Sequence, residues 1–198
     1  MTIPIDEAPA LRAVSALFEF YDRPYWIAGG WAVDLRIGAP RRQHDDVDVM
    51  ILERDLDAFV RCFAGNEFVV VDHQTDEERT FQWPTELVPG RDTLRFKTAP
   101  APIEVLINKS DGDDWVFHRG GRIRRPLTDI GLRSQSGLPY LQPDLLLLFK
   151  ARSDRAKDDE DFRALLPFLT DEQKAWLRPR LTRPGQPEHR WAPYLAGR

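Results

Sequence analysis

Two aspartates, Asp46 and Asp48, stand at the start of the apolar stretch 47–52 and are the clearest chemical signal in the chain. The stretch predicts a β-strand, on which alternate side chains point to the same face. Asp46 and Asp48 should therefore lie side by side, with Asp45 facing away. Two carboxylates ~4 Å apart repel by about 4 kcal/mol at an effective dielectric of 20, which a cation between them would relieve. Oxygen ligands suit Mg²⁺, which is often bound through one or two carboxylates and substrate phosphates, so the pair predicts magnesium with a nucleotide.

A glycine pair, Gly29 and Gly30, lies upstream between a short apolar stretch at 25–28 and a predicted helix at 31–37. Glycine allows the backbone to approach a phosphate closely and to adopt positive φ. The N-terminus of the following helix offers N–H groups and a positive dipole end to an anion. A glycine pair alone is also typical of an ordinary tight turn. Its position before the two aspartates is what favours phosphate binding here.

The wider pattern that contains both features covers residues 24–52. It consists of Gly29, Gly30, Trp31, Asp34, Gly38, Arg42, His44, Asp45, Asp46 and Asp48. This pattern resembles the nucleotidyltransferase superfamily, whose fold is shared with DNA polymerase beta. Within it, the pattern is most similar to the antibiotic branch of aminoglycoside 2''-adenylyltransferases and lincosamide nucleotidyltransferases. The resemblance implies transfer of AMP, or another NMP, from ATP or another NTP to a hydroxyl of a small molecule. It also implies Mg²⁺ as the metal, release of pyrophosphate, and an aminoglycoside or lincosamide antibiotic as a candidate acceptor.

A third acidic residue, Glu104, is the only charge in the predicted strand 103–107. The resemblance implies that it joins Asp46 and Asp48, either as a metal ligand or as the general base on the attacking hydroxyl. The antibiotic branch usually has aspartate at this place, and the extra methylene of glutamate changes the reach by about 1.5 Å. The alternative is a glutamate on the protein surface.

Three cations are candidates for binding the nucleotide. Arg42 and His44 precede the aspartate strand and would contact the triphosphate, or His44 would orient an aspartate. Lys150 follows the apolar run 145–149 and would stabilise the pyrophosphate leaving group. The alternative for Lys150 is an ion pair with the acidic run 158–161, which we otherwise interpret as a favourably charged helix start.

The predicted elements indicate an α+β fold. We expect a nucleotidyltransferase-type mixed β-sheet flanked by helices over residues 1–140, and a small C-terminal helical region over 141–198. The predicted strands are 25–28, 47–52, 67–72, 80–83, 93–97, 103–107 and 115–118. The predicted helices are 7–22, 31–37, 54–63, 144–153, 158–166 and 170–180, with a short one near Trp191.

The bulk properties restrict the partners. The chain has 198 residues and a net charge of −4, which argues against a nucleic-acid backbone as the main partner. The arginine-rich stretch 119–125 lacks interleaved aromatic residues for base stacking and is interpreted as a solvated edge. Because neither a signal peptide nor a membrane-spanning segment is recognisable, we expect a cytoplasmic protein. Cys62, the single cysteine, is predicted to be a packed core thiol.

Two other functions are compatible with the same residues. One is nucleotidyl transfer to a protein or an RNA end, as in small toxin-like relatives of the superfamily. The other is a non-catalytic nucleotide-binding module, against which the intact Asp46, Asp48 and Glu104 argue. The sequence leaves the acceptor, the preferred NTP and the oligomeric state open.

Overall fold

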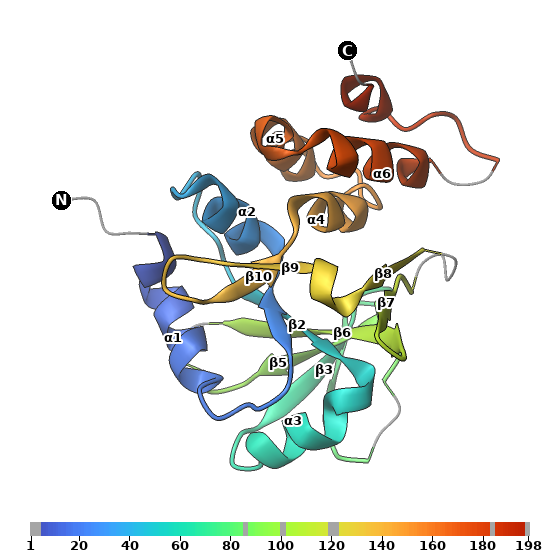
Figure 1. The fold of residues 1–198 in the computed structure, drawn as a ribbon. Coiled ribbons are helices and arrows are strands. Elements are labelled where there is room, and N and C mark those ends of the chain that lie inside the picture. The colour runs from blue at the N-terminus through green and yellow to red at the C-terminus, as the bar shows by residue number, and fades with distance from the viewer. Residues whose placement is uncertain (1–4, 85–86, 100–101, 119–122, 183–184, 197–198) are drawn as a thin grey trace.

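The computed structural model describes residues 5–84, 87–99, 102–118, 123–182 and 185–196. Its centre is a ten-stranded mixed sheet (Figure 1). Eight of the strands follow the order β4-β3-β5-β6-β2-β1-β10-β9, and the other two, β7 and β8, extend from β6. The strands are β1 (Tyr25–Ile27), β2 (Val47–Leu52), β3 (Phe68–Asp72), β4 (Glu77–Thr80), β5 (Asp92–Phe96), β6 (Ile103–Asp111), β7 (Asp114–Val116), β8 (Arg124–Pro126), β9 (Gly131–Arg133) and β10 (Pro139–Leu141). The predicted α+β class is confirmed.

Helices cover the sheet and continue beyond it at the C-terminal end. They are α1 (Pro9–Leu17), α2 (Gly29–Ile37), α3 (Leu56–Cys62), α4 (Pro143–Lys150), α5 (Ala156–Leu165) and α6 (Asp171–Leu181), with short 3₁₀ turns between them. Helices α4, α5 and α6 gather at one end of the molecule, where α2 contacts both α4 and α5 (Figure 1). Within the described residues, no helix is long and apolar enough to cross a membrane.

Strand β2 lies at the middle of the sheet because its sequence is apolar on both faces. It pairs antiparallel with β1 and parallel with β6. The parallel register places Asp48 opposite Glu104 and Met50 opposite Leu106. Val47, Val49 and Ile51 point to the other face, and all three are buried. Parallel strands of this kind are typically covered on both sides, and only Asp48 interrupts the apolar run.

Several predicted boundaries are wrong for physical reasons. The first helix ends at Leu17 rather than at residue 22, and the strand predicted at 80–83 is β4, Glu77–Thr80, an exposed edge strand without apolar alternation. β6 continues to Asp111, beyond the predicted strand end at residue 107, where the buried Asn108 accepts a hydrogen bond from Trp115 Nε1 at 3.1 Å. Cys62 is exposed at the end of α3 and is not a core thiol.

The C-terminal helices are attached to the sheet through β8. Arg125 donates to both carboxylate oxygens of Asp144, at 3.1 and 2.5 Å, and lies over the Trp176 ring at 3.7 Å. Arg125 is therefore not part of a solvated edge as predicted, whereas Arg124 does remain at the surface, paired with Asp111. Arg119 and Arg122 lie outside the described residues. The division into regions at residue 140 stays a prediction.

A cluster of phenylalanines packs α1 and α3 against the sheet. Phe59 on α3 is fully buried and lies against Phe18, Phe63, Phe68 and Phe96, with ring centroids 4.7–6.4 Å apart. The cluster lies away from the cavity described below. It therefore offers a test of stability that is separate from function.

Phe59→Ala should lower the free energy of unfolding by about 3–5 kcal/mol, because it leaves a cavity in a packed core. Phe20→Ala is the matched control, since Phe20 is 82% exposed and its truncation should change stability by less than about 0.5 kcal/mol. Urea unfolding of the two variants measures both values. Equal stability of the two variants would contradict the packing described here.

Candidate active site

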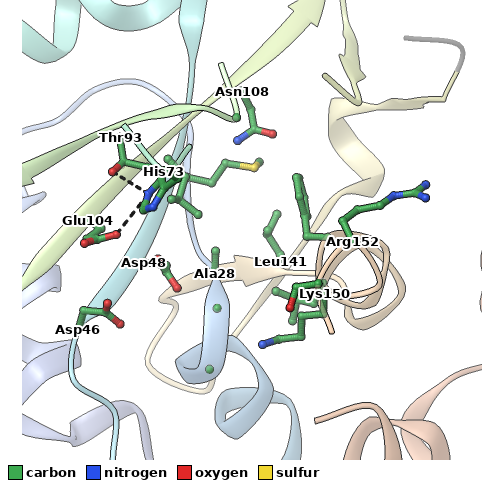
Figure 2. A pocket seen from close by; sticks show the side chains of 18 of the residues that line it. Ala28, Asp46, Asp48, His73, Thr93, Glu104, Asn108, Leu141, Lys150 and Arg152 are labelled. Carbon is green, nitrogen blue, oxygen red and sulfur yellow. Dashed lines mark hydrogen bonds and ion pairs between the residues drawn. The ribbon is translucent and has the colours of Figure 1, made fainter. Parts of the chain in front are cut away.

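Asp46, Asp48 and Glu104 meet at one cavity of about 640 Å³. Asp46 directly precedes β2, Asp48 lies on β2, and Glu104 lies beside Asp48 on the neighbouring parallel strand. Figure 2 shows the three carboxylates around one part of this cavity, with Asp48 nearest to Ala28 at the start of α2. The structure therefore brings together the three acidic residues that the sequence singles out.

The site concentrates negative charge in a poorly solvated place. Burial, together with the charges of Asp46 and Glu104, raises the pKa of Asp48 to about 7. Burial and the charge of Glu104 also raise the pKa of Asp46. Both shifts have the direction expected when desolvation and like charges oppose ionisation. A cation bound between Asp46 and Asp48 would reverse the two effects.

The carboxylates of Asp46 and Asp48 fit a metal ion that takes its remaining ligands from water and phosphate. In the described part of the chain, no group of three or more histidine, cysteine or acidic side chains is close enough to hold a metal as it stands. Asp46 and Asp48 offer only oxygen ligands. Mg²⁺ binds in this way, through one or two carboxylates supplemented by water and phosphate oxygens.

Glu104 is buried rather than on the surface, with 8% of the residue exposed. Arg95, its partner across the β5–β6 ladder, donates from Nε and Nη2 to Glu104 Oε1 at 3.0 and 2.6 Å. The other oxygen, Oε2, lies 3.8 Å from His73 Nε2, and the same nitrogen is 3.1 Å from Thr93 Oγ1. Arg95 thus fixes Glu104 Oε1, whereas Oε2 remains on the side of the cavity.

Gly29 and Gly30 form the first turn of α2, two residues earlier than the predicted helix start. Gly29 has a φ of +57°, and a Cβ on it would lie 1.8 Å from Asp48 Oδ2. A Cβ on Gly30 would lie 2.4 Å from the His44 ring and 2.6 Å from Arg42 Nη2. Glycine at both positions is therefore required by neighbouring side chains, and it leaves the α2 N-terminus at the cavity wall.

Asp34, which the sequence marks only through its place in the pattern, anchors the loop before β2. Its buried carboxylate accepts hydrogen bonds from Arg41 N and Nε, both at 3.2 Å, and lies 2.7 Å from His44 Nε2. The His44 ring packs on Trp31 at 4.7 Å, and Trp31 Nε1 donates to the Asp46 carbonyl at 3.0 Å. The chain from α2 to the first aspartate is thus held in one conformation.

Lys150 lines the cavity, and its charge is shared with two buried carboxylates. Its Nζ lies 3.1 Å from Asp158 Oδ1 and 2.7 Å from Asp161 Oδ2. Asp161 also pairs with Arg41, and its Oδ2 is 3.9 Å from Arg42 Nη2. Asp158 and Asp161 are fully buried, so this part of the acidic run is not merely a solvated helix start. These five cationic and acidic groups connect α4, α5 and the loop before β2.

Two further findings modify the expected site. Asp45 is exposed and lines the same cavity as Asp46, because both residues precede the strand and strict alternation does not yet apply. His73, Thr93 and Asn108 also line the cavity, although no sequence pattern singled them out. The alternation of β5 and its pairing with β6 would have indicated Thr93, but that register is not visible in a single sequence.

Comparisons with known proteins agree with this geometry. Residues 10–88 match the family described as aminoglycoside-2''-adenylyltransferase. A 2''-aminoglycoside nucleotidyltransferase from Escherichia coli is 42% identical over 53 residues, which are 25% of this chain and 30% of that protein. One from Klebsiella pneumoniae is 47% identical over 45 residues, which are 21% of this chain and 25% of that protein. The matched stretch thus spans less than a third of the length of these relatives.

Solved structures resemble the chain over most of its length. The crystal structure of ANT(2'')-Ia in complex with adenylyl-2''-tobramycin has a TM-score of 0.57 at 13% identity, covering 86% of this chain and 94% of that chain. The lincomycin-bound lincosamide antibiotic adenylyltransferase LnuA has a TM-score of 0.53 at 18% identity, covering 79% and 94%. The chain therefore has the nucleotidyltransferase fold. Within that fold, the predicted resemblance to the aminoglycoside and lincosamide enzymes is confirmed.

Asp48→Asn should stabilise the metal-free protein at high pH. Folding raises the pKa of the Asp48 carboxyl to about 7. The contribution of this carboxyl to stability is therefore fully present only below its pKa in the unfolded chain, and it is lost as the pH rises through about 7. The variant should gain about 4 kcal/mol over the native chain at pH 8 and nothing near pH 4, since folding raises this pKa by roughly three units and each unit is worth about 1.4 kcal/mol. Urea unfolding in EDTA at pH 8 and at pH 4 measures this gain in the free energy of unfolding. Asp45→Asn is the control, since Asp45 is exposed. A difference independent of pH would contradict the interpretation.

Proposed function

We propose that the chain is a Mg²⁺-dependent nucleotidyltransferase that moves AMP from ATP, or another NMP from its NTP, to a hydroxyl of a small molecule and releases pyrophosphate. The observation that carries the proposal is the convergence of Asp46, Asp48 and Glu104 with the N-terminus of α2 in one cavity. The relatives named above act on aminoglycosides or lincosamides by their names, which supports an antibiotic of either class as acceptor.

The nucleotide would lie with its phosphates against the start of α2. Gly29 and Gly30 supply the helix N-terminus, whose N–H groups and dipole favour an anion. Arg42, His44 and Lys150 line the same side and would contact the triphosphate. Since Lys150 and Arg42 are already oriented by Asp161, they would stabilise the charge of the leaving group without reorganising.

Asp46 and Asp48 would hold the metal, with Glu104 as a third ligand or as the base. Magnesium supplies charge neutralisation at the phosphate, which is the usual contribution of such ions to in-line displacement. The acceptor oxygen attacks the α-phosphorus, the bond from that phosphorus to the bridging oxygen of the β-phosphate breaks, and the electron pair leaves with pyrophosphate. In the base role, the hydroxyl proton passes to Glu104 Oε2, the oxygen that Arg95 does not engage.

The remaining partner assignments follow from charge and composition. We propose that the protein works in the cytoplasm on an NTP and a small acceptor, without a nucleic acid or a membrane as partner. The net charge of −4 supports this assignment. Nucleotidyl transfer to tRNA or to a protein, offered as additional acceptors, would instead favour the toxin-like alternative.

Asp46→Asn and Asp48→Asn should each lower turnover about 10³-fold or more, because each removes a carboxylate that holds the metal. The measurement is pyrophosphate release from each of the four NTPs with Mg²⁺, against a panel of aminoglycosides and lincosamides. Asp45→Asn is the matched control and should retain activity, since Asp45 is exposed at the cavity rim. Near-normal pyrophosphate release by both variants would contradict the mechanism.

Glu104→Gln should also lower kcat, by about 10²-fold or more, and it separates the two roles of this residue. Loss of a general base leaves the Mg²⁺ concentration needed for half-maximal rate unchanged, whereas loss of a metal ligand raises it. Glu78→Gln is the control, because Glu78 binds the same Arg95 from the exposed side. Full activity of Glu104→Gln would contradict both proposed roles of Glu104.

A further inference from the structure

Arg95 and Glu104 lie opposite each other on β5 and β6 and share one face of the sheet. On the other side of Glu104, the parallel register places Asp48. Nε and Nη2 of Arg95 both donate to Glu104 Oε1, at 3.0 and 2.6 Å. The guanidinium fork therefore closes on a single oxygen, whereas a parallel bidentate pair would engage both. This pairing fixes the carboxylate without occupying its second oxygen.

The second oxygen of Glu104, Oε2, is left for a ligand. Among the described residues, none donates a hydrogen bond to it. His73 Nε2 lies 3.8 Å away, beyond hydrogen-bonding distance, and is itself 3.1 Å from Thr93 Oγ1. Figure 2 shows the Glu104 carboxylate beside His73 at the cavity. Because Glu104 is buried, this oxygen has lost most of its water and gains from a partner in the cavity.

Arg95 itself is not among the described residues that line the cavity, whereas Glu104 is. Its remaining printed contact points outward, since Nη1 donates to Glu78 Oε1 at 2.5 Å and the Glu78 side chain is half-exposed. The Arg95 side chain is partly exposed at this edge of the sheet. Any effect of Arg95 on a bound substrate must therefore pass through Glu104.

The carboxylate of Glu104 depends on Arg95 for its place. A glutamate side chain has several rotatable bonds, and holding it in one rotamer has an entropic cost that the two hydrogen bonds offset. Without Arg95, Glu104 would also lose the cation that offsets its repulsion with Asp48 on the neighbouring strand. A displacement of about 1 Å at a reacting group is enough to lower a rate about 10²-fold.

We propose that Arg95 is a positioning residue for nucleotidyl transfer, which holds Glu104 Oε1 at the sheet so that Oε2 faces the cavity in one orientation. The proposal rests on the function proposed above, and it holds for either role of Glu104. In the base role Oε2 receives the hydroxyl proton, and in the ligand role Oε2 contacts the metal. In both roles the transfer step needs Oε2 at a fixed position, whereas the nucleotide phosphates bind beside α2.

Arg91 and Asp72 form a matched pair that serves as a control. Arg91 donates from Nε, at 2.8 Å, and from Nη2 to the same oxygen of Asp72, Oδ2. The Arg91 and Arg95 side chains are 42% and 36% exposed, and those of Asp72 and Glu104 are 11% and 10% exposed. Neither Arg91 nor Asp72 is among the described residues that line the cavity. Loss of Arg91 therefore breaks an equivalent ion pair without removing a contact to Glu104.

Steady-state kinetics of the full chain at saturating Mg²⁺ test the proposal, with the NTP and the acceptor of the panel above that give the fastest pyrophosphate release. Arg95→Ala should lower kcat about 10²-fold and leave the KM for the NTP within about threefold, because it displaces Oε2 and not the groups beside α2. Arg91→Ala should leave kcat within about threefold. An unchanged kcat in Arg95→Ala, or an equal loss in both variants, would overturn the proposal.

Guanidinium rescue separates positioning from a general loss of structure. Because the Arg95 side chain is partly exposed, a guanidinium ion can enter the space that Arg95→Ala leaves and donate to Glu104 Oε1. At concentrations far below those that unfold proteins, it should raise the kcat of Arg95→Ala at least about tenfold and leave Arg91→Ala unchanged. Urea at the same concentration, which has a similar shape without the charge, should not. No recovery with guanidinium, or equal recovery with urea, would overturn the proposal.

Arg95→Lys keeps the test decisive where Arg95→Ala does not fold. Lysine retains the charge but places one ammonium group where the guanidinium fork donates two hydrogen bonds. Its kcat should fall about tenfold, while urea unfolding should find a free energy of unfolding close to that of the native chain. A native kcat in Arg95→Lys would show that the charge alone suffices, and the positioning role would then be wrong.

Binding of a non-hydrolysable ATP analogue distinguishes the failure of this proposal from that of the proposed function. At saturating Mg²⁺, calorimetry should find affinities within about threefold for the native chain and Arg95→Ala. Loss of analogue binding in Arg95→Ala would place the effect of Arg95 on the nucleotide and overturn its role toward Glu104 alone. Absence of pyrophosphate release by the native chain, with every NTP and acceptor of the panel, would overturn the proposed function and the role of Arg95 with it.

Discussion

The parallel pairing of β2 with β6 is the constraint on which the site depends. It sets Asp48 directly beside Glu104 and keeps Asp46 close to both, so that like charges share one poorly solvated face. Cationic side chains on two sides of the carboxylates partly neutralise this charge. Arg95 neutralises Glu104 from the neighbouring strand β5, and Lys150 and Arg155 act on Asp48 from the C-terminal part of the chain. Burial, together with the charges of Asp46 and Glu104, still raises the pKa of Asp48, and a divalent ion would offset both effects.

Buried carboxylates organise the basic side of the cavity in the same way. Asp34 holds Arg41 and His44, and Asp161 holds Arg41 and Lys150. Arg41 is thus shared between helix α2 and helix α5. Breaking one such buried pair leaves an uncompensated charge, which generally costs several kcal/mol. The cations that face the nucleotide side are consequently placed by the fold before any phosphate arrives.

The sequence was sufficient for the parts of the site that are local in the chain. Alternation on β2 and the glycine pair were enough to select Asp46, Asp48 and the start of α2, whereas Glu104 was selected through the resemblance to the superfamily. Arg95 and Thr93 escaped notice because their roles come from strand register. The acidic run 158–161 was considered as a partner of Lys150, but the pairing of Asp161 with Arg41 spans 120 residues and could not be predicted. The exposed edge strand β4 was misplaced because a polar edge carries no hydrophobic pattern.

The place where the family match ends has a consequence for how such chains diversify. The matched segment, 10–88, holds Asp46, Asp48 and the first turn of α2, whereas Glu104 on β6 and Lys150 on α4 lie beyond it. The side chains of this one cavity are therefore encoded by separate stretches of the polypeptide. Substitutions in the later stretches can change the cavity wall while the matched segment stays intact. Similarity in the matched segment reports on Asp46, Asp48 and the start of α2, and β5 and β6 can vary independently of it.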